Sequence, residues 1–197
     1  MKKQPHQLFS LIFFIFISFF SYSQNCKYSK EEFNEEQKTE ILETKKTMIS
    51  GLATSNIKVG FGRKNEAYYL LFDYSRSEPK NTRTPNIEVN FPAVHYINEG
   101  YKLIFILSND EEIILFSDDN TTTTSSETTP LFTDFSINNH RYIISKEDVE
   151  KMTTSEIKGV EFEYQKENKT SIYTHRNKLN RLKSKNLKNR ALCIVNG

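Results

Sequence analysis

The chain has 197 residues and a formal net charge of +2, and the length that remains after an N-terminal leader suits one domain and is too short for two. Only six glycines are present, which excludes a glycine-rich loop that cradles phosphate. The small net charge hides an uneven distribution. Residues 24–168 hold 17 basic and 25 acidic residues, whereas residues 169–197 hold eight basic residues and no acidic residue.

The N-terminus has the pattern of a secretory signal peptide. A positively charged start is followed by an apolar run from Leu8 to Phe20 and by the small-x-small sequence Ser21-Tyr22-Ser23. The run is shorter than the roughly 20 apolar residues of a membrane-spanning helix. We therefore predict a cleavable signal peptide over residues 1–23 and one exported domain, periplasmic or secreted, over residues 24–197. An uncleaved membrane anchor and a lipid attached to Cys26 are the alternatives.

Two cysteines, Cys26 and Cys193, lie near the two ends of the mature chain. In an oxidising compartment such a pair is expected to be bridged. On the chain-entropy model, closing so long a loop stabilises a fold by about 5 kcal/mol. A reactive or metal-binding thiol is the alternative, but the sequence has no C-x-x-C motif and no histidine close to either cysteine. The sequence therefore favours a Cys26–Cys193 disulfide.

The first half of the mature chain predicts β-strands after a polar entry segment. Residues 24–38 are acidic and polar, and we expect them to be irregular or to form a short helix capped by Ser29. The sequence Gly60-Phe61-Gly62 predicts a bulge or a close approach of the backbone. β-branched and aromatic residues alternate with a period of two, which indicates strands near residues 57–61, 68–72 and 87–91.

The clearest local unit is an antiparallel hairpin. The apolar runs Tyr101–Leu107 and Ile113–Phe116 flank a five-residue polar connection, which is too short for a parallel crossover. Because both runs are almost continuously apolar, we expect this hairpin to lie centrally with both faces covered. The threonine-rich segment 118–130 that follows is predicted to be a loop.

The second half of the chain mixes strands with two helices. Ser145 precedes Lys146-Glu147-Asp148, the pattern of a helix N-cap with acidic residues in the first turn. Apolar residues recur at helical spacing from Asn177 to Ile194, which predicts a terminal amphipathic helix. Strand pairs are expected at residues 131–137 and 141–144, and at residues 160–164 and 171–174. The sequence therefore predicts a single α+β domain, with an antiparallel sheet on which a short helix and a basic C-terminal helix pack.

Several short motifs together resemble small exported bacterial proteins of unknown function. They are an early cysteine after the signal, the strand sequence YYLLFDY, a tight hairpin, the helix start SKEDVEKM and a lysine-rich terminal helix that ends in ALCIV. The resemblance covers most of the mature chain. It implies a compact α+β domain and supplies no catalytic residues.

The terminal helix carries most of the basic residues that follow Glu167. A basic amphipathic helix attracts phosphate-rich partners, so this helix is a candidate for peripheral contact with an anionic membrane surface. Export makes nucleic acid an unexpected partner. The alternative is a helix whose basic side chains are solvated or face the acidic remainder of the domain. The candidate residues are Arg181, Lys183, Lys185, Lys188 and Arg190.

Patterns for catalysis or metal binding are weak. The histidines His95, His140 and His175 lack the spacing of a metal motif, and there is no G-x-S-x-G nucleophile elbow. We predict no catalytic residue, metal or cofactor. Tyrosines on strands usually pack, but they are also candidates for a groove that binds carbohydrate or peptide. The candidate tyrosines are Tyr68, Tyr69, Tyr74, Tyr96 and Tyr101.

We therefore expect an exported protein without catalysis that acts by binding an envelope or extracellular partner, or as an envelope accessory. One alternative is a small extracytoplasmic hydrolase, whose fold would gather the histidines and carboxylates in a pocket. Another is attachment to an anionic envelope surface through the basic terminal helix.

Overall fold

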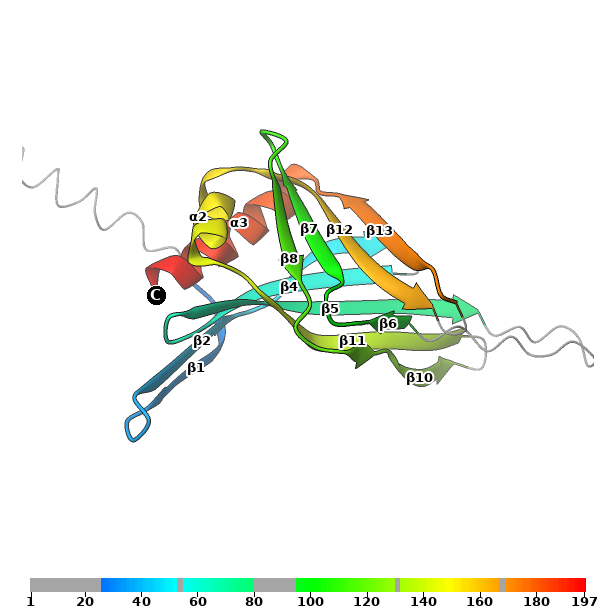
Figure 1. Ribbon diagram of the computed structural model, residues 1–197, viewed down its shortest axis with the longest axis horizontal. Helices are drawn as coiled ribbons and strands as arrows, with labels where there is room; N and C mark the ends of the chain where they lie inside the picture. The colour runs from blue at the N-terminus through cyan, green and yellow to red at the C-terminus, as the bar shows by residue number, and fades with distance from the viewer. Residues whose placement is uncertain (1–25, 53–54, 80–94, 130–131, 167–168) are drawn as a thin grey trace, which may run out of the picture.

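Two antiparallel β-sheets face each other and two helices lie side by side at one end, as the computed structural model shows (Figure 1). The structure describes residues 26–52, 55–79, 95–129, 132–166 and 169–197, which form a single α+β domain. The predicted signal peptide and the predicted strand near residues 87–91 lie outside these residues. The α+β prediction is confirmed, whereas the expected single sheet is divided into two.

The first sheet has seven strands in the order β1-β2-β4-β5-β11-β10, with β3 also pairing with β4. Its long central strands share a regular antiparallel register, in which Val59 lies opposite Phe72. The strands are β1 (Tyr28–Asn34), β2 (Thr39–Thr44), β3 (Thr47–Leu52), β4 (Ser55–Lys64), β5 (Ala67–Pro79), β10 (Thr124–Thr129) and β11 (Phe132–Ile143).

The second sheet has six strands in the order β8-β7-β12-β6-β9, with β13 on the other side of β12. The predicted hairpin of residues 101–116 is confirmed as the β7–β8 pair, and the predicted strands 160–164 and 171–174 are confirmed as β12 and β13. The strands are β6 (His95–Ile97), β7 (Lys102–Leu107), β8 (Glu112–Phe116), β9 (Thr121–Thr122), β12 (Ile157–Lys166) and β13 (Ile172–Lys178).

The core lies between the two sheets because each contributes the apolar side chains of one face. Phe72 of the first sheet and Phe162 of the second are fully buried, with ring centroids 5.1 Å apart. Leu103, Phe105 and Leu107 alternate inward along β7, whereas Ile104 and Ile106 face outward. The period of two thus buries one face of the strand and leaves the other near solvent.

The two helices cover one end of the core. Ser145 caps α2 (Lys146–Thr154) as predicted, because its side chain accepts a hydrogen bond from the Asp148 N–H. α3 (Arg181–Asn196) begins later than predicted, with Asn180 as its N-cap, since the preceding residues belong to β13. No helix within the described ranges is both long and apolar enough to cross a membrane.

Several local predictions were wrong because polar residues pair across strands. Residues 24–38 were expected to be irregular or helical, but Tyr28–Asn34 forms β1 and pairs with β2. Segment 118–130 contains the two strands β9 and β10 and is not only a loop. The expected pair at residues 131–137 and 141–144 is one strand, β11, interrupted by a register shift between Ile137 and His140.

The β7–β8 hairpin is not covered on both faces. β8 lies at the end of the strand order, so one of its edges has no strand partner in the second sheet among the described residues. Ile114 and Phe116 are 42% and 54% exposed, and they point away from the core. The second sheet therefore has an outer face on which apolar side chains reach solvent.

Candidate functional site

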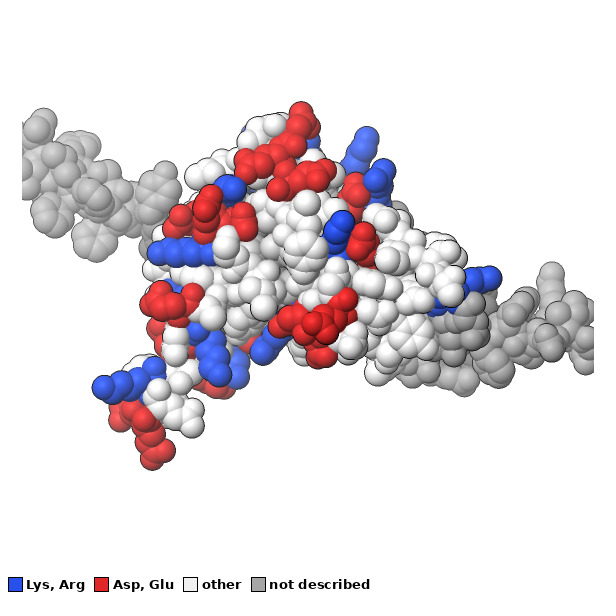
Figure 2. Space-filling view, viewed as in Figure 1, with Lys and Arg blue, Asp and Glu red and all other residues white. Residues whose placement is uncertain are grey.

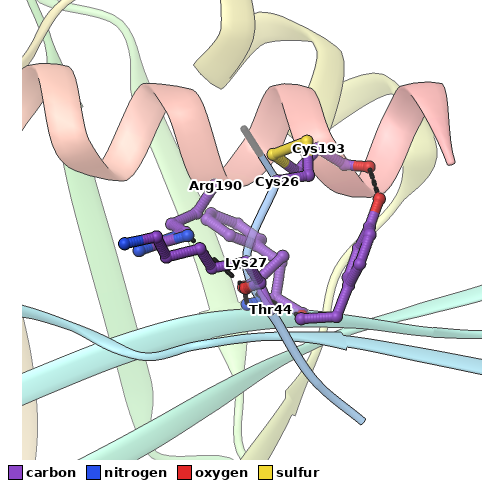
Figure 3. Close-up of a disulfide and its surroundings, with 7 residues drawn as sticks. Cys26, Lys27, Thr44, Arg190 and Cys193 are labelled. Atoms are coloured by element: carbon purple, nitrogen blue, oxygen red, sulfur yellow. Dashed lines mark hydrogen bonds between the residues drawn. A yellow bond between two sulfur atoms is a disulfide. The ribbon is translucent and has the colours of Figure 1, made fainter. Parts of the chain in front are cut away.

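The structure contains a disulfide between Cys26 and Cys193 (Figure 3). It joins the segment before β1 to the last turns of α3, with the two Cα atoms 5.5 Å apart. The Tyr28 hydroxyl donates to the Cys193 carbonyl at 3.0 Å, which adds a polar contact at the same junction. The bond therefore fixes the terminal helix against the first sheet.

The five basic candidates of α3 do not form one continuous face. Arg181, Lys185 and Lys188 are spaced by four and three residues and share one side of the helix, whereas Lys183 and Arg190 are seven residues apart and share another. The helix buries a further side against the sheets, through residues that include Leu187, Ala191 and Ile194. The basic charge is thus divided between two sides of the helix.

Two of these basic side chains contact the backbone of neighbouring elements. Lys188 Nζ donates to the Thr154 carbonyl at 3.0 Å, where α2 ends and its carbonyl dipoles favour a cation. Arg190 Nη1 donates to the Lys27 carbonyl at 3.5 Å, beside the disulfide (Figure 3). These contacts give both side chains a part in holding α3 in place.

Two of the three histidines in the described residues meet in an aromatic cluster at the inter-sheet surfaces of β5, β6, β12 and β13. His95 is 1% exposed and its ring stacks on Tyr74, with centroids 6.0 Å apart. His175 packs against Phe162, with centroids 5.2 Å apart. We call the following residues the aromatic cluster: Tyr74, His95, Phe162, Tyr164 and His175.

The aromatic cluster keeps its histidines neutral. Burial, with Arg76 and Lys166 nearby, lowers the pKa of His95 to about 3, and burial also lowers the pKa of His175. Neither ring nitrogen of His95 has a hydrogen-bond partner in the described part of the chain. The five residues of the aromatic cluster include no carboxylate, so the cluster itself supplies no acid–base couple.

His140 lies elsewhere and contacts two hydroxyl groups. Its Nε2 is 2.9 Å from Ser117 Oγ and its Nδ1 is 2.7 Å from Thr121 Oγ1. A serine beside a histidine is the first requirement of nucleophilic catalysis. Here, however, Ser117 Oγ donates to the Asp119 carbonyl at 2.6 Å, so its proton points away from the imidazole.

The Ser117–His140 pair is also closed to substrate. Ser117 and His140 are each 3% exposed, and Ser117 forms an isolated β-bridge with Tyr142. Burial lowers the pKa of His140, against the opposing charges of Asp118 and Asp119. The arrangement links the end of β8 to β11, and it does not present a nucleophile at a surface.

The tyrosines do not line a groove. Tyr68 and Tyr74 are buried, at 7% and 4% exposure, and Tyr69 points to the opposite face of β5 from Tyr68. The Tyr69 ring occupies the space where a side chain at Gly62 would lie, so the predicted close approach of the backbone at Gly60-Phe61-Gly62 is confirmed. The burial of Tyr68 and Tyr74 fits the expectation that strand tyrosines pack, and it removes the alternative of a groove lined by these tyrosines.

A groove does exist on the outer face of the second sheet, at the middle of β12. Its volume is about 590 Å³, which is within the range of small-molecule sites. Gly159 lies on its floor beside Ile106, because a register shift after Ile157 places the glycine opposite Ile106 on the outer face. We call this the β12 groove; its lining residues are Ile106, Lys158, Gly159, Val160, Glu161, Arg176, Asn177 and Lys178.

The rim of the β12 groove carries three cations. Arg176 Nε contacts Glu161 Oε2 at 3.0 Å, and Lys158 Nζ contacts Asp110 Oδ1 at 2.7 Å. Lys178 is exposed and has no ion-pair partner within the described ranges. The rim therefore keeps one positive charge that no neighbouring carboxylate balances. Figure 2 shows this face, on which charged side chains lie among broad uncharged areas.

Sequence reasoning missed the β12 groove. It placed the start of this strand at residue 160 and so left out Gly159, although a glycine inside a strand is a known sign of a close approach by another group. It also assigned Lys178 to the terminal helix, whereas Lys178 lies with Arg176 on β13. No group of three or more potential metal-ligating side chains occurs in the described residues.

A scan against protein-family models, a search of curated proteins and a search of solved structures each found no match to this chain.

Proposed function

We propose that this protein is exported through residues 1–23 and acts outside the cytoplasm by binding, without catalysis. The observation that carries the binding role is the β12 groove, a hollow of about 590 Å³ over a glycine on an otherwise ordered sheet. Ligand sites are concave, mainly apolar and edged by a few polar groups, and the groove has this composition. The Cys26–Cys193 disulfide supports an oxidising compartment, where such bonds persist.

Export is tested by expressing the full chain and analysing each cell fraction by mass spectrometry. We expect a mature chain that begins at Gln24, lies outside the cytoplasm and is lighter by two hydrogen atoms than its reduced form. Full-length chain with Met1 intact and both thiols free in the cytosol would contradict export.

Binding is tested by thermal-shift screening of a chemically mixed panel of anionic, cationic and neutral small molecules. We expect compounds that raise the Tm of the wild type but leave that of Gly159→Leu unchanged, because the leucine would fill the groove. A panel of chromogenic ester and peptide substrates tests the absence of catalysis. Hydrolysis that Ser117→Ala abolishes would favour the hydrolase alternative.

A further inference from the structure

The outer face of the second sheet is polarised across its strands. Ile114, Ile104, Glu161 and Arg176 lie opposite one another in this order on β8, β7, β12 and β13. In the neighbouring row, Glu112, Ile106, Gly159 and Lys178 lie opposite one another on β8, β7, β12 and β13. Isoleucines therefore occupy β7 and the middle of β8, the acidic Glu112 lies at the outer edge of the second row, and basic side chains occupy the β13 side.

The β12 groove lies between these two sides. Neighbouring strands are about 4.8 Å apart, so about 10 Å separate β7 from β13 and about 14 Å separate β8 from β13. Gly159 has no side chain to interrupt this path. A ligand that crosses the strands could thus lay an apolar portion on the isoleucines and place a polar end at β13.

The charge at β13 selects the sign of that polar end. Arg176 is 77% exposed on its side chain and uses one of its five N–H donors on Glu161, while Lys178 has no acidic partner in the part of the chain that the structure describes. With Lys158 paired to Asp110 and Arg176 paired to Glu161, one positive charge is left over. One uncompensated charge matches a monoanion.

We propose that the β12 groove binds an amphipathic carboxylate, whose apolar chain lies over Ile106 and Gly159 and whose carboxylate contacts Lys178 and Arg176. This inference rests on the proposed binding function and adds the chemical class of the ligand. The occupant is a single soluble molecule with an unbranched apolar chain of about 10 to 14 Å, as the strand spacing requires.

Decanoate is a suitable probe, and isothermal titration of the mature, disulfide-bonded chain measures its affinity. Decanol and a decyl trimethylammonium salt have the same chain with a neutral and a cationic end. We expect decanoate to bind more tightly than either, with an affinity that falls as salt is added. Equal or tighter binding of decanol or of the cation overturns the assignment of the head group, while leaving the proposed binding function in place.

Two pairs of variants locate the site. Gly159→Leu fills the hollow and is expected to abolish decanoate binding. Gly159→Ala is its control, because a Cβ there would lie 3.4 Å from the Asn177 carbonyl and 3.6 Å from Ile106 Cδ1, which are ordinary contacts. Lys178→Gln is expected to weaken binding by about tenfold, the equivalent of one charge-assisted hydrogen bond. Lys185→Gln, on the exposed side of α3, is expected to leave it unchanged.

Other results would overturn the proposal. Decanoate binding that survives both Gly159→Leu and Lys178→Gln places the ligand elsewhere. No decanoate binding, together with Lys178-dependent binding to phosphatidylglycerol vesicles, replaces the single ligand with a membrane surface. Vesicle binding that depends on Lys185 and not on Lys178 would assign the anionic surface to α3. If neither probe binds but panel compounds still act through Gly159, only the ligand class is wrong.

Discussion

His95 and His140 are buried to almost the same degree, yet their surroundings differ. His140 has a hydroxyl group at each ring nitrogen, 2.9 Å and 2.7 Å away, whereas neither nitrogen of His95 has a partner in the described residues. His95 instead packs its ring between Tyr74 and Tyr164, with centroids 6.0 Å and 4.4 Å away. The burial of a histidine therefore does not by itself show whether the side chain is a catalytic base or a structural hydrogen-bonding group; its hydrogen bonds decide this.

The largest difference between the two histidines should follow from replacing each with phenylalanine. His140→Phe removes two hydrogen bonds and leaves the buried Ser117 hydroxyl with fewer partners, so we expect a loss of about 3 kcal/mol in the free energy of unfolding. His95→Phe removes no side-chain hydrogen bond and keeps the ring packing, so we expect a change within about 1 kcal/mol. Urea denaturation of the two purified variants measures both values.

Equal losses for the two phenylalanine variants would mean that ring shape alone explains both sites. A large loss for His95→Phe only would show that its nitrogens have polar contacts that matter for folding. Intact disulfide in both variants, checked by thiol titration, is the necessary control because its loss would add a separate destabilisation.

The next largest effect should be the response to acid. The folded pKa of His95 is about 3, below the usual value of 6.5, because burial and two nearby cations disfavour its charged form. Between pH 6.5 and pH 3 the unfolded chain therefore binds more protons than the folded chain. The contribution of neutral His95 to the free energy of unfolding is thus complete above pH 6.5 and is lost as the pH falls towards 3. At pH 5 the loss amounts to about 2 kcal/mol.

His95→Phe isolates this acid response. Urea denaturation at about pH 7 and about pH 5 gives the free energy of unfolding at each pH. Between these pH values we expect the free energy of unfolding to fall by about 2 kcal/mol less in the variant than in the wild type. His140 and His175 also have lowered pKa values, and they stay in both proteins, so their contributions cancel in the comparison. Parallel pH profiles for wild type and variant would show that His95 is protonated without cost in the folded state.

Local patterns in the sequence predicted the elements whose contacts are local. The β7–β8 hairpin follows from two apolar runs and a short turn, and α2 follows from Ser145 and the acidic first turn. The start of α3 was misplaced because Leu182 continues an apolar helical spacing. In the structure Leu182 is 67% exposed, and the buried position is taken by Ser184, which accepts the Ile157 N–H at 2.9 Å.

The division into two sheets and the β12 groove depend on pairing between distant residues. Nothing near His95 in the sequence indicates that β6 pairs with residues 165–166 of β12. Likewise, the register shift between Ile157 and Gly159 decides which face the glycine occupies, and it is set by β7 about 50 residues earlier. The disulfide was the exception, because each of the two cysteines in the chain has only the other as an intramolecular partner.

The smallest effect concerns the hydrogen bond between Thr121 and His140. It tests which groups donate and which accept in the series that runs from Thr121 through His140 and Ser117 to the Asp119 carbonyl. Since Ser117 Oγ–H donates to the Asp119 carbonyl, His140 Nε2–H must donate to Ser117, and Nδ1 must accept from Thr121. Thr121→Val keeps the side-chain shape, removes that donor and should cost about 1 kcal/mol in urea denaturation. Thr122→Val, at an exposed neighbour, is the control.

Nitrogen NMR of the wild type tests the same direction without a substitution. We expect it to show His140 as the Nε2–H tautomer. The Nδ1–H tautomer would instead make Ser117 the donor to His140 and restore the geometry of a nucleophile and its base.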